Sequence, residues 1–487
     1  MPEPLAALGG QAALAETVER ARQVLAAGQL DQAETLFRQA LSLAPDQPEI
    51  LHALANIASQ RGDIARAAVF LERAAGSPTA SPEIFGFLCQ VYRVQGRLNA
   101  ALAAGMEAMR RVGHSARAAF NLGMAQVEAR AFEEATNSLL HALALDPNFA
   151  PARLELGHLL LRNGEFKAGW IEYEWRFRLD HTRDSLPKIN APQWNGMRLP
   201  RGRILLIGDQ GYGDTIQFAR YIPWVKERVG EVVLGCCQEL LPLISQVPGI
   251  HSSFVRWEDI PGFSAFCPLS SLPGVFGTEV NTIPAPTPYL SADPAKVARW
   301  SARIRSAVGD GPLKVGIAWA GRPSHPNDRM RTLRWSQLQP LTRVPGVALV
   351  ALQKDIPASD RAEFPGGLGA LDLSTEIGDF ADTAAIIESL DLVITIDSSA
   401  AHLAGALSKP AWVLLPWVPD WRWLMDREDT PWYPSLRLFR QPSRGDWAST
   451  IERVAQELAA LQRAGSPVHA RQDVTGPPPT LRTEVPA

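Results

Sequence analysis

Small residues in the first third of the chain recur with a period of about 34 residues, and this restricts the fold more than any other feature. Glycines recur at this spacing, small residues keep the same register five and twelve positions later, and prolines close two of the units. The positions are Gly28, Gly62, Gly96, Arg130 (in the glycine slot) and Gly164; Ala33, Ala67, Ala101, Ala135 and Gly169; Ala40, Ala74, Ala108 and Ala142; Pro45 and Pro147. Glycine turns the chain, small residues let two helices approach closely, and proline ends a helix. The period therefore predicts stacked helix hairpins over residues 14–178.

In these registered positions, residues 14–178 resemble the tetratricopeptide repeat family, with about five repeats. The resemblance implies a concave face suited to an extended peptide or another protein. A structural spacer or dimerisation module is the alternative. The last repeat carries the aromatic stripe GWIEYEWRF, which predicts a helix that packs the solenoid onto the next domain. Residues 179–202, rich in Pro, Gly and Asn, read as a linker.

Length and charge narrow the class of protein. At 487 residues the chain exceeds one hydrophobic core, so several domains are expected. A net charge of −3 gives no indication of a protein that binds nucleic acid by bulk electrostatics. No basic leader and no apolar run of about 18 residues occurs, so we expect no membrane span and a cytoplasmic location. Four cysteines without CxxC spacing predict free thiols rather than a zinc site or a disulfide framework.

A strand, a short helix and a second strand follow one another between residues 391 and 416. Residues 392–396 and 411–415 are apolar runs typical of buried parallel strands, and the Ala-rich segment 400–407 between them predicts a helix. Such a unit places the start of its helix at the carboxyl end of a strand, where open α/β sheets bind ligands.

Polar residues stand where this helix begins. Asp397, Ser398 and Ser399 are helix-capping types, and the free N–H groups there favour a phosphate. His402 lies one turn further along and would add a donor or contact a sugar. The alternative is a plain unit whose serines only cap the helix.

A glycine-rich turn follows the first strand of the α/β region. Residues 203–207 predict that strand, and Gly208, Gly211 and Gly213 lead into a helix over residues 215–229. Their spacing is not the dinucleotide fingerprint, which argues against a nicotinamide cofactor. Asp214 stands at the start of the helix, where its carboxylate would bind a substrate hydroxyl. The alternative is that it caps its own helix.

Cationic and polar side chains also follow later strands. Residues 314–319 form a predicted strand, and Arg329 and Arg331 in the loop after it would face one cleft if the segment is extended. Two guanidiniums suit a diphosphate, although a solvated surface loop is the alternative. Gln353 and Lys354 follow the strand predicted at 347–352. Strand ends that all carry polar groups predict a nucleotide cleft. Six of the fourteen tryptophans lie between residues 412 and 447, where packing is favoured over base stacking.

Two long motifs resemble glycosyltransferase family 9, which contains the lipopolysaccharide heptosyltransferases. They are ILLIGDQGYGDTIQFARYIP at 204–223 and VITIDSSAAHLAGALSKPAWVLLP at 393–416, with weaker support from VGIAWAG at 315–321. The pairing with tetratricopeptide repeats is similar to bacterial repeat-linked glycosyltransferases and, more distantly, to the protein O-linked N-acetylglucosamine transferases. The resemblance implies the GT-B fold of two Rossmann-like halves, here 203–295 and 296–463. It also implies inversion without a metal.

The resemblance assigns roles to particular residues. Gly213 and Asp214 match the family's Gly-Asp pair, whose Asp is the proposed base. The segment from Asp397 to His402 matches Asp-Thr-Gly-x-x-His, which holds the donor diphosphate, with Ser398 and Ser399 in place of Thr-Gly.

The family's Lys-Arg pair is not cleanly present. Arg329, Arg331 and Lys354 are the substitutes, and Gly211 and Gln353 complete the expected donor site.

The sequence thus predicts an α + α/β chain, an all-α tetratricopeptide solenoid followed by a GT-B glycosyltransferase. The expected activity moves a sugar from a UDP- or ADP-linked nucleotide-sugar to a protein or glycan acceptor, without cofactor or metal. The repeats would recruit the acceptor or a partner. A non-catalytic scaffold with a degenerate glycosyltransferase-like domain is the alternative. Residues 464–487 lack an apolar pattern and are expected to be disordered.

Overall fold

The chain forms two compact units, Met1–Leu156 and Gly157–Ala487, each described here by itself. The computed structural model describes residues 4–111, 114–179, 186, 189–284, 287–325, 327–364 and 370–464. The predicted disordered tail lies outside these residues, apart from Ala464, the last residue of a helix. Within these ranges, no helix has the length and apolar character needed to cross a bilayer.

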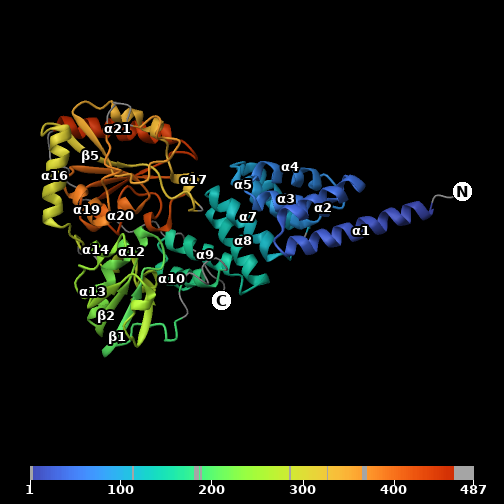
Figure 1. Ribbon diagram of the computed structural model, residues 1–487, viewed down its shortest axis with the longest axis horizontal. Coiled ribbons are helices and arrows are strands. Elements are labelled where there is room, and N and C mark those ends of the chain that lie inside the picture. Colours follow the sequence, from blue (N-terminus) through green and yellow to red (C-terminus); the bar gives the residue numbers. More distant parts are fainter. Residues whose placement is uncertain are drawn as a thin grey trace. The chain divides into compact units, whose positions relative to one another are not determined.

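The first unit consists of helices that pack in consecutive pairs (Figure 1, blue to teal). They are α1 (Pro4–Ala26), α2 (Leu30–Leu43), α3 (Pro48–Gln60), α4 (Ile64–Ala75), α5 (Pro82–Val94), α6 (Leu98–Arg111), α7 (Ala116–Glu128) and α8 (Phe132–Leu145). The next pair, α9 (Ala150–Arg162) and α10 (Phe166–Tyr173), begins in the first unit and ends in the second. The predicted hairpins are confirmed.

The turns explain why glycine recurs at a fixed period. Gly28, Gly62 and Gly96 have φ angles of 76°, 78° and 77°, in the left-handed region that only glycine adopts without strain. Arg130 occupies the same slot and has a φ of 58°. The turn between the helices therefore imposes a positive φ even on a residue that is not glycine.

The registered alanines explain how closely the helices pack. All eight have an exposed fraction of 0%: Ala33, Ala67, Ala101, Ala135, Ala40, Ala74, Ala108 and Ala142. A methyl group is the largest side chain that these contacts between helices accommodate, because a packed interior leaves few voids.

The second unit contains two all-parallel sheets. The smaller has β1 (Leu199–Ile207), β2 (Val229–Gly235), β3 (Ser252–Phe254) and β4 (Ala265–Pro268) in the order β3-β2-β1-β4. Its helices include α12 (Tyr212–Phe218), α13 (Ile222–Lys226), α14 (Leu241–Ile244) and α15 (Leu272–Val275). β1 begins inside the segment predicted as a linker. The helix predicted over residues 215–229 is divided into α12, a 3-10 turn and α13, where Pro223 cannot continue the hydrogen-bond pattern.

The larger sheet has six strands in the order β10-β9-β8-β5-β6-β7. They are β5 (Leu313–Ala318), β6 (Val347–Ala351), β7 (Ala370–Leu371), β8 (Leu392–Ile396), β9 (Ala411–Leu415) and β10 (Leu436–Arg440). Its helices are α16 (Pro294–Val308), α17 (Asp328–Arg331), α18 (Gln339–Thr342), α19 (Phe380–Glu388), α20 (Ser399–Ala406) and α21 (Trp447–Ala464). The predicted strand–helix–strand unit is confirmed as β8, α20 and β9. The first strand of the sheet, β5, lies in its middle, as in doubly wound nucleotide-binding folds.

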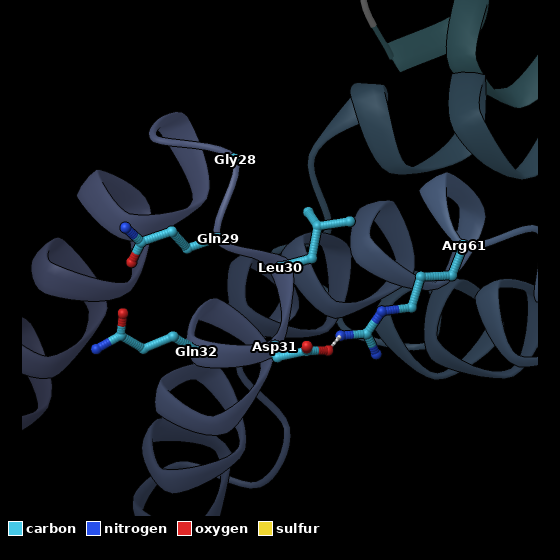
Figure 2. A pocket seen from close by; sticks show the side chains of 6 residues that line it. All are labelled: Gly28, Gln29, Leu30, Asp31, Gln32 and Arg61. Carbon is cyan, nitrogen blue, oxygen red and sulfur yellow. Dashed lines mark hydrogen bonds and ion pairs between the residues drawn. The ribbon is translucent and has the colours of Figure 1, made fainter.

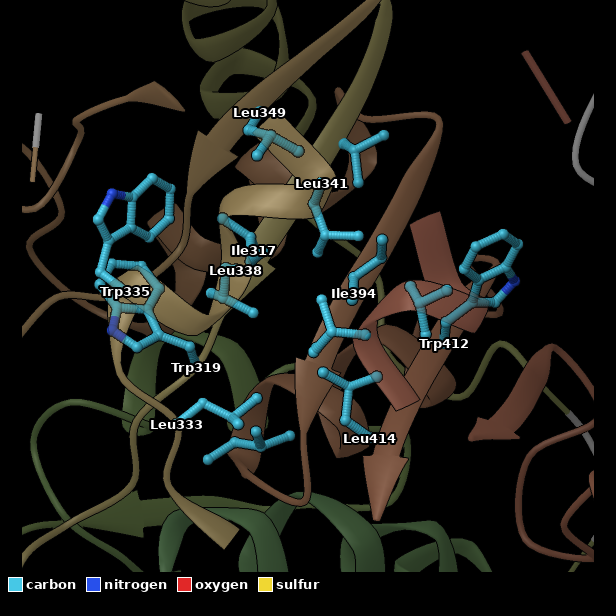
Figure 3. Close-up of a cluster of buried hydrophobic side chains, with 14 of the residues drawn as sticks. Ile317, Trp319, Leu333, Trp335, Leu338, Leu341, Leu349, Ile394, Trp412 and Leu414 are labelled. Carbon is cyan, nitrogen blue, oxygen red and sulfur yellow. The ribbon is translucent and has the colours of Figure 1, made fainter. Parts of the chain in front are cut away.

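The core of the larger sheet lies between its strands and the helices on one face. Figure 3 shows Ile317, Ile394 and Leu414 from three strands against Leu338 and Leu341. The sequences of these strands are continuous apolar runs because helices cover both faces of a parallel sheet.

The helix α10 packs against both sheet regions. The Trp170 indole Nε1 donates to the carbonyl oxygen of Thr278, 2.8 Å away, and its ring meets the Trp421 ring edge to face at 5.2 Å. Trp170 and Tyr173 are buried. The aromatic stripe is therefore a packing surface, and it fixes the positions of the two sheet regions relative to each other.

Candidate functional site

The two middle strands of the larger sheet, β5 and β8, are followed by the residues that form the core of the site. From this pair of strands the chain proceeds to opposite edges of the sheet, which is the arrangement that forms a ligand-binding crevice at the strand ends of open α/β sheets. Arg331, from the loop after β5, crosses that crevice: its Nη1 donates to the carbonyl oxygen of Asp397 at the end of β8, 2.8 Å away. The structure thus brings Arg331 and Asp397 together.

Arg329 has a different environment. The segment from Asp328 to Arg331 forms the helical turn α17, not the extended segment we expected. Side chains two residues apart on a helix do not face the same side. The Arg331 side chain is 15% exposed and lies 3.5 Å from the Asp328 carboxylate, whereas Arg329 is exposed.

The serine pair begins α20. The Ser398 hydroxyl accepts a hydrogen bond from the Ala400 N–H at 3.3 Å and lies 3.0 Å from the Thr395 hydroxyl. Ser399 is the first helical residue and is half-buried. Capping by Ser398 is therefore observed. Burial raises the pKa of the neighbouring Asp397 carboxyl, and the charge of Asp420 adds to this effect.

His402 is buried one turn into α20. Its Nδ1 lies 3.0 Å from the Tyr433 hydroxyl, and its ring stacks on Trp423 at 5.5 Å and 25°. Burial, followed by the positive charge of Arg422, lowers the pKa of His402 to about 3. The imidazole is therefore neutral at physiological pH, with its ring orientation fixed by two aromatic neighbours.

The helices α12 and α20 meet at their first turns. A Cβ atom on Gly213 would lie 2.7 Å from Cδ2 and 3.4 Å from Nε2 of His402, and 3.5 Å from the Cα atom of Ser399. Only glycine permits this approach, because real Cβ contacts do not fall below 3.0 Å. The two motifs, which are widely separated in the sequence, therefore share one location.

Asp214 is engaged on both of its carboxylate oxygens. One oxygen, Oδ2, accepts a hydrogen bond from the Gly211 N–H at 2.9 Å, which is the helix-capping role considered above. The other, Oδ1, forms an ion pair with Nη2 of Arg422. The side chain remains 22% exposed, so solvent reaches it.

Arg422 is the residue that the sequence interpretation missed. Its Nε donates to Oε1 of Gln217 at 2.6 Å, its Nη1 donates to Asp420 at 2.9 Å, and its side chain is only 9% exposed. Burial opposes ionisation of Asp420, but Arg422 outweighs it and holds the pKa of that carboxyl below its usual value. The only signal in the sequence was an Asp-x-Arg between tryptophans, PDWRW, which reads as packing.

A second buried arginine, Arg220, lies beside the site. Its guanidinium carbon is 4.8 Å from the centre of the Tyr289 ring and 5.0 Å from that of Tyr433, and Nη2 donates to the Trp432 carbonyl oxygen. Among the residues that the structure describes, its buried Nε and Nη1 find no hydrogen-bond partner. Its charge also lowers the pKa of His402, after burial and Arg422.

Gln353 and Lys354 position the backbone. The Gln353 side-chain oxygen accepts from the N–H groups of Trp319 and Ala320 at 3.2 and 3.0 Å, so it shapes the loop after β5. The Lys354 ammonium donates to the carbonyl oxygen of Gly378 at 2.6 Å.

The side chains of the tryptophan-rich segment are mainly buried in packing contacts. Trp421, Trp423 and Trp432 have at most 1% of their surface exposed, as expected for a crossover segment packed onto a sheet. All four cysteines are free thiols, and Cys237 alone is not fully buried.

A cavity of about 260 Å³ lies at the carboxyl ends of β1, β2 and β3. Its lining includes Gly208, Asp209, Gln210 and Cys237. At about 30 Å³ per water, its volume corresponds to roughly eight or nine water molecules, enough for a small polar group. Burial raises the pKa of Asp209, which forms an Oδ1 hydrogen bond with the Ser270 N–H at 3.1 Å.

The repeats carry surface features of their own. A recess of about 510 Å³ is lined by Gly28, Gln29, Leu30, Asp31, Gln32 and Arg61. Figure 2 shows these residues, with the ion pair between Arg61 and Asp31.

Half-buried aromatic rings also lie on, or directly before, the first helices of successive hairpins. His52 and Phe87 lie 5.8 Å apart, Phe120 and Phe149 lie 5.5 Å apart, and Arg117 stands over the Phe149 ring at 5.8 Å.

Comparison with known proteins identifies the repeats. The family described as tetratricopeptide repeat matches residues 24–88. Protein FlbA of Caulobacter vibrioides is 28% identical over 330 residues, which cover 62% of this chain and 53% of that protein. The chain thus spans about half the length of this curated relative. The N-terminal region carries tetratricopeptide repeats, which indicate a role in protein interaction.

Solved structures match part of the chain. YrrB, titled a TPR protein with an unusual peptide-binding site, is 16% identical, covers 34% of this chain and 85% of its own, and has a TM-score of 0.29. PilF of Pseudomonas aeruginosa is 20% identical, and the match covers 36% of this chain and 82% of PilF, with a TM-score of 0.33. MamA of Desulfovibrio magneticus RS-1 is 17% identical, and the match covers 35% of this chain and 97% of the MamA chain, with a TM-score of 0.31.

Proposed function

We propose that the α/β region is an inverting, metal-independent glycosyltransferase of GT-B architecture, and that the repeats recruit its acceptor or a partner. The observation that supports this most directly is the contact between α12 and α20 at Gly213 and His402. It brings Asp214 from one Rossmann-like half beside the crevice that Arg331 and Asp397 span in the other.

The crevice between β5 and β8 suits the donor diphosphate. The positive end of the α20 helix dipole favours an anion, and Arg331 supplies positive charge at the strand ends. A cation fixed in place before the reaction stabilises the charge that develops on the leaving group, as a metal would.

The transfer is a single displacement. The acceptor hydroxyl oxygen forms a bond to the anomeric carbon as the bond from that carbon to the phosphate oxygen breaks. The electron pair leaves with the nucleoside diphosphate, and Asp214 takes the hydroxyl proton. Attack from the face opposite the leaving group inverts the anomeric configuration. The cavity rimmed by Gly208 and Gln210, in the loop directly before the helix that carries Asp214, is the candidate entry for the acceptor.

A non-catalytic scaffold is the second candidate. The observation that favours it is the engagement of both Asp214 oxygens by protein groups, with which an acceptor hydroxyl would have to compete. In that case the repeats would bind partners, and the ring pairs His52–Phe87 and Phe120–Phe149 would belong to the contact surface.

The test is Asp214→Asn in the full chain, with Asp310→Asn, an exposed loop residue, as the matched control. We expect the wild type to release nucleotide from a UDP- or ADP-sugar in the presence of an acceptor lysate. Asp214→Asn should abolish release while UDP or ADP still binds in calorimetry. Unchanged release in Asp214→Asn would contradict its role as the base. Neither binding nor release by the wild type would support the scaffold.

A further inference from the structure

The side chain of Arg422 joins the two Rossmann-like halves next to the proposed reaction centre. It extends from the segment after β9 and contacts Asp214 and Gln217, which both lie on α12 of the other half. The guanidinium therefore controls the carboxylate that would act as base.

The contacts of Arg422 are of two kinds. Asp420 accepts hydrogen bonds from both the backbone N–H of Arg422, at 3.0 Å, and its Nη1, at 2.9 Å. This double contact within one turn, together with the bond to Gln217, places the guanidinium independently of Asp214. Arg422 therefore keeps its position if Asp214 separates from Nη2.

A nucleoside diphosphate competes well with a carboxylate for such a group. It brings more than one negative charge, and a phosphate oxygen forms a strong charge-assisted hydrogen bond with a guanidinium N–H group. The first turn of α20, where the diphosphate is proposed to bind, is in contact with Gly213, the residue directly before Asp214.

We propose that Arg422 is a donor-responsive switch on the base. Without donor its Nη2 holds Asp214, and when donor binds, the β-phosphate takes over Nη2 and leaves Asp214 available for the acceptor proton. This inference rests on the proposed function. It makes Arg422 both a diphosphate ligand and the group that makes activation of the base depend on prior donor binding.

The test exploits the competition between Asp214 and the diphosphate. Binding of UDP, ADP, UMP and AMP to the full chain is measured by calorimetry for the wild type, Arg422→Lys, Asp214→Asn and the double variant. Arg422→Lys should weaken UDP or ADP binding at least about tenfold, because it loses the charge-assisted hydrogen bond from Nη2. Asp214→Asn should tighten the same binding, because it removes the competing carboxylate. The affinity for UMP and AMP should change less than about twofold in either variant, which is within the ordinary scatter of such contacts.

Two controls separate this switch from a purely structural contact. Arg303 forms an ion pair of two hydrogen bonds with Glu376, at 2.7 and 3.0 Å, away from the site, so Arg303→Lys should leave nucleotide binding unchanged. In the Arg422→Lys background, Asp214→Asn should no longer tighten UDP or ADP binding. A gain in affinity cannot arise from misfolding, so the result is informative even if Arg422→Lys lowers stability.

Three results would overturn the inference. The first is equal weakening of diphosphate and monophosphate by Arg422→Lys, which would make Arg422 only a structural link. The second is unchanged or weaker UDP and ADP binding in Asp214→Asn, which would remove the competition while leaving the proposed function in place. The third, no nucleotide binding by the wild type, would overturn this inference together with the proposed function.

Discussion

Replacing Gly213 by alanine tests the contact on which the site depends. The added Cβ would lie 2.7 Å from Cδ2 of His402, so one of the two helices must move by roughly 0.7 Å to reach an ordinary carbon–carbon distance of about 3.4 Å. His402 has little freedom to yield, because it is hydrogen-bonded to Tyr433 and stacked on Trp423. The strain must therefore separate α12 from α20.

Overpacking of this kind costs about 1–3 kcal/mol of unfolding free energy. Part of the cost would disappear if the neighbour were truncated, so in a His402→Ala background the Gly213→Ala change should be milder. The coupling free energy between the two positions should be at least about 0.5 kcal/mol, as for residues in contact.

Urea unfolding followed by tryptophan fluorescence measures this effect cleanly. All fourteen tryptophans lie between Trp170 and Trp447, so the signal reports on the second unit alone. Gly311→Ala is the matched control, since its Cβ would meet nothing within 4 Å and its φ is not positive. If Gly213→Ala and Gly311→Ala unfold within about 0.5 kcal/mol of each other, the packing argument is refuted. UDP or ADP affinity should fall in Gly213→Ala and not in the control.

Two further predictions concern pH and the repeats. The pKa of His402 is lowered from 6.5 to about 3, so its contribution to stability is complete above pH 6.5 and declines as the pH falls toward 3. By pH 5 the loss should reach about 2 kcal/mol relative to pH 8, and this component should be absent from His402→Gln in urea titrations at both pH values. In the repeats, Ala101→Leu should lower the unfolding free energy of the first unit by about 1–3 kcal/mol, because Ala101 is fully buried between helices. Circular dichroism of the helices measures it, and the exposed Ala103→Leu should show no comparable loss.

Much of the fold could be predicted from the sequence because its signals are local. The glycine period corresponds to turns with positive φ, and the strands β8 and β9 occupy the residues predicted for them. Shorter and less regular elements were missed. β10 and α16 carry mixed apolar and charged residues, and β3 has only three residues. β3 and β10 become strands by pairing with β2 and β9, whereas α16 has local start signals, Asp293 as N-cap and Pro294 in its first turn, that the sequence interpretation did not use.

The site was only partly predictable. The capping oxygens of Asp214 and Ser398 follow from residue type and position, and both helix-capping bonds are present. The extended segment expected for Arg329 and Arg331 forms a helical turn instead, because backbone conformation in a polar loop depends on contacts that no local pattern records.

The sequence by itself determined the periodic repeat, the buried parallel strands and the residues that begin their helices, since these depend on spacing and on neighbours along the chain. Only the tertiary structure decided which strand ends meet and which cation reaches Asp214. Arg422 and that carboxylate lie far apart along the chain, and the packing of one half against the other brings them together. Long-range electrostatic pairs of this kind leave no periodic trace, because their specificity resides in three-dimensional distance and burial.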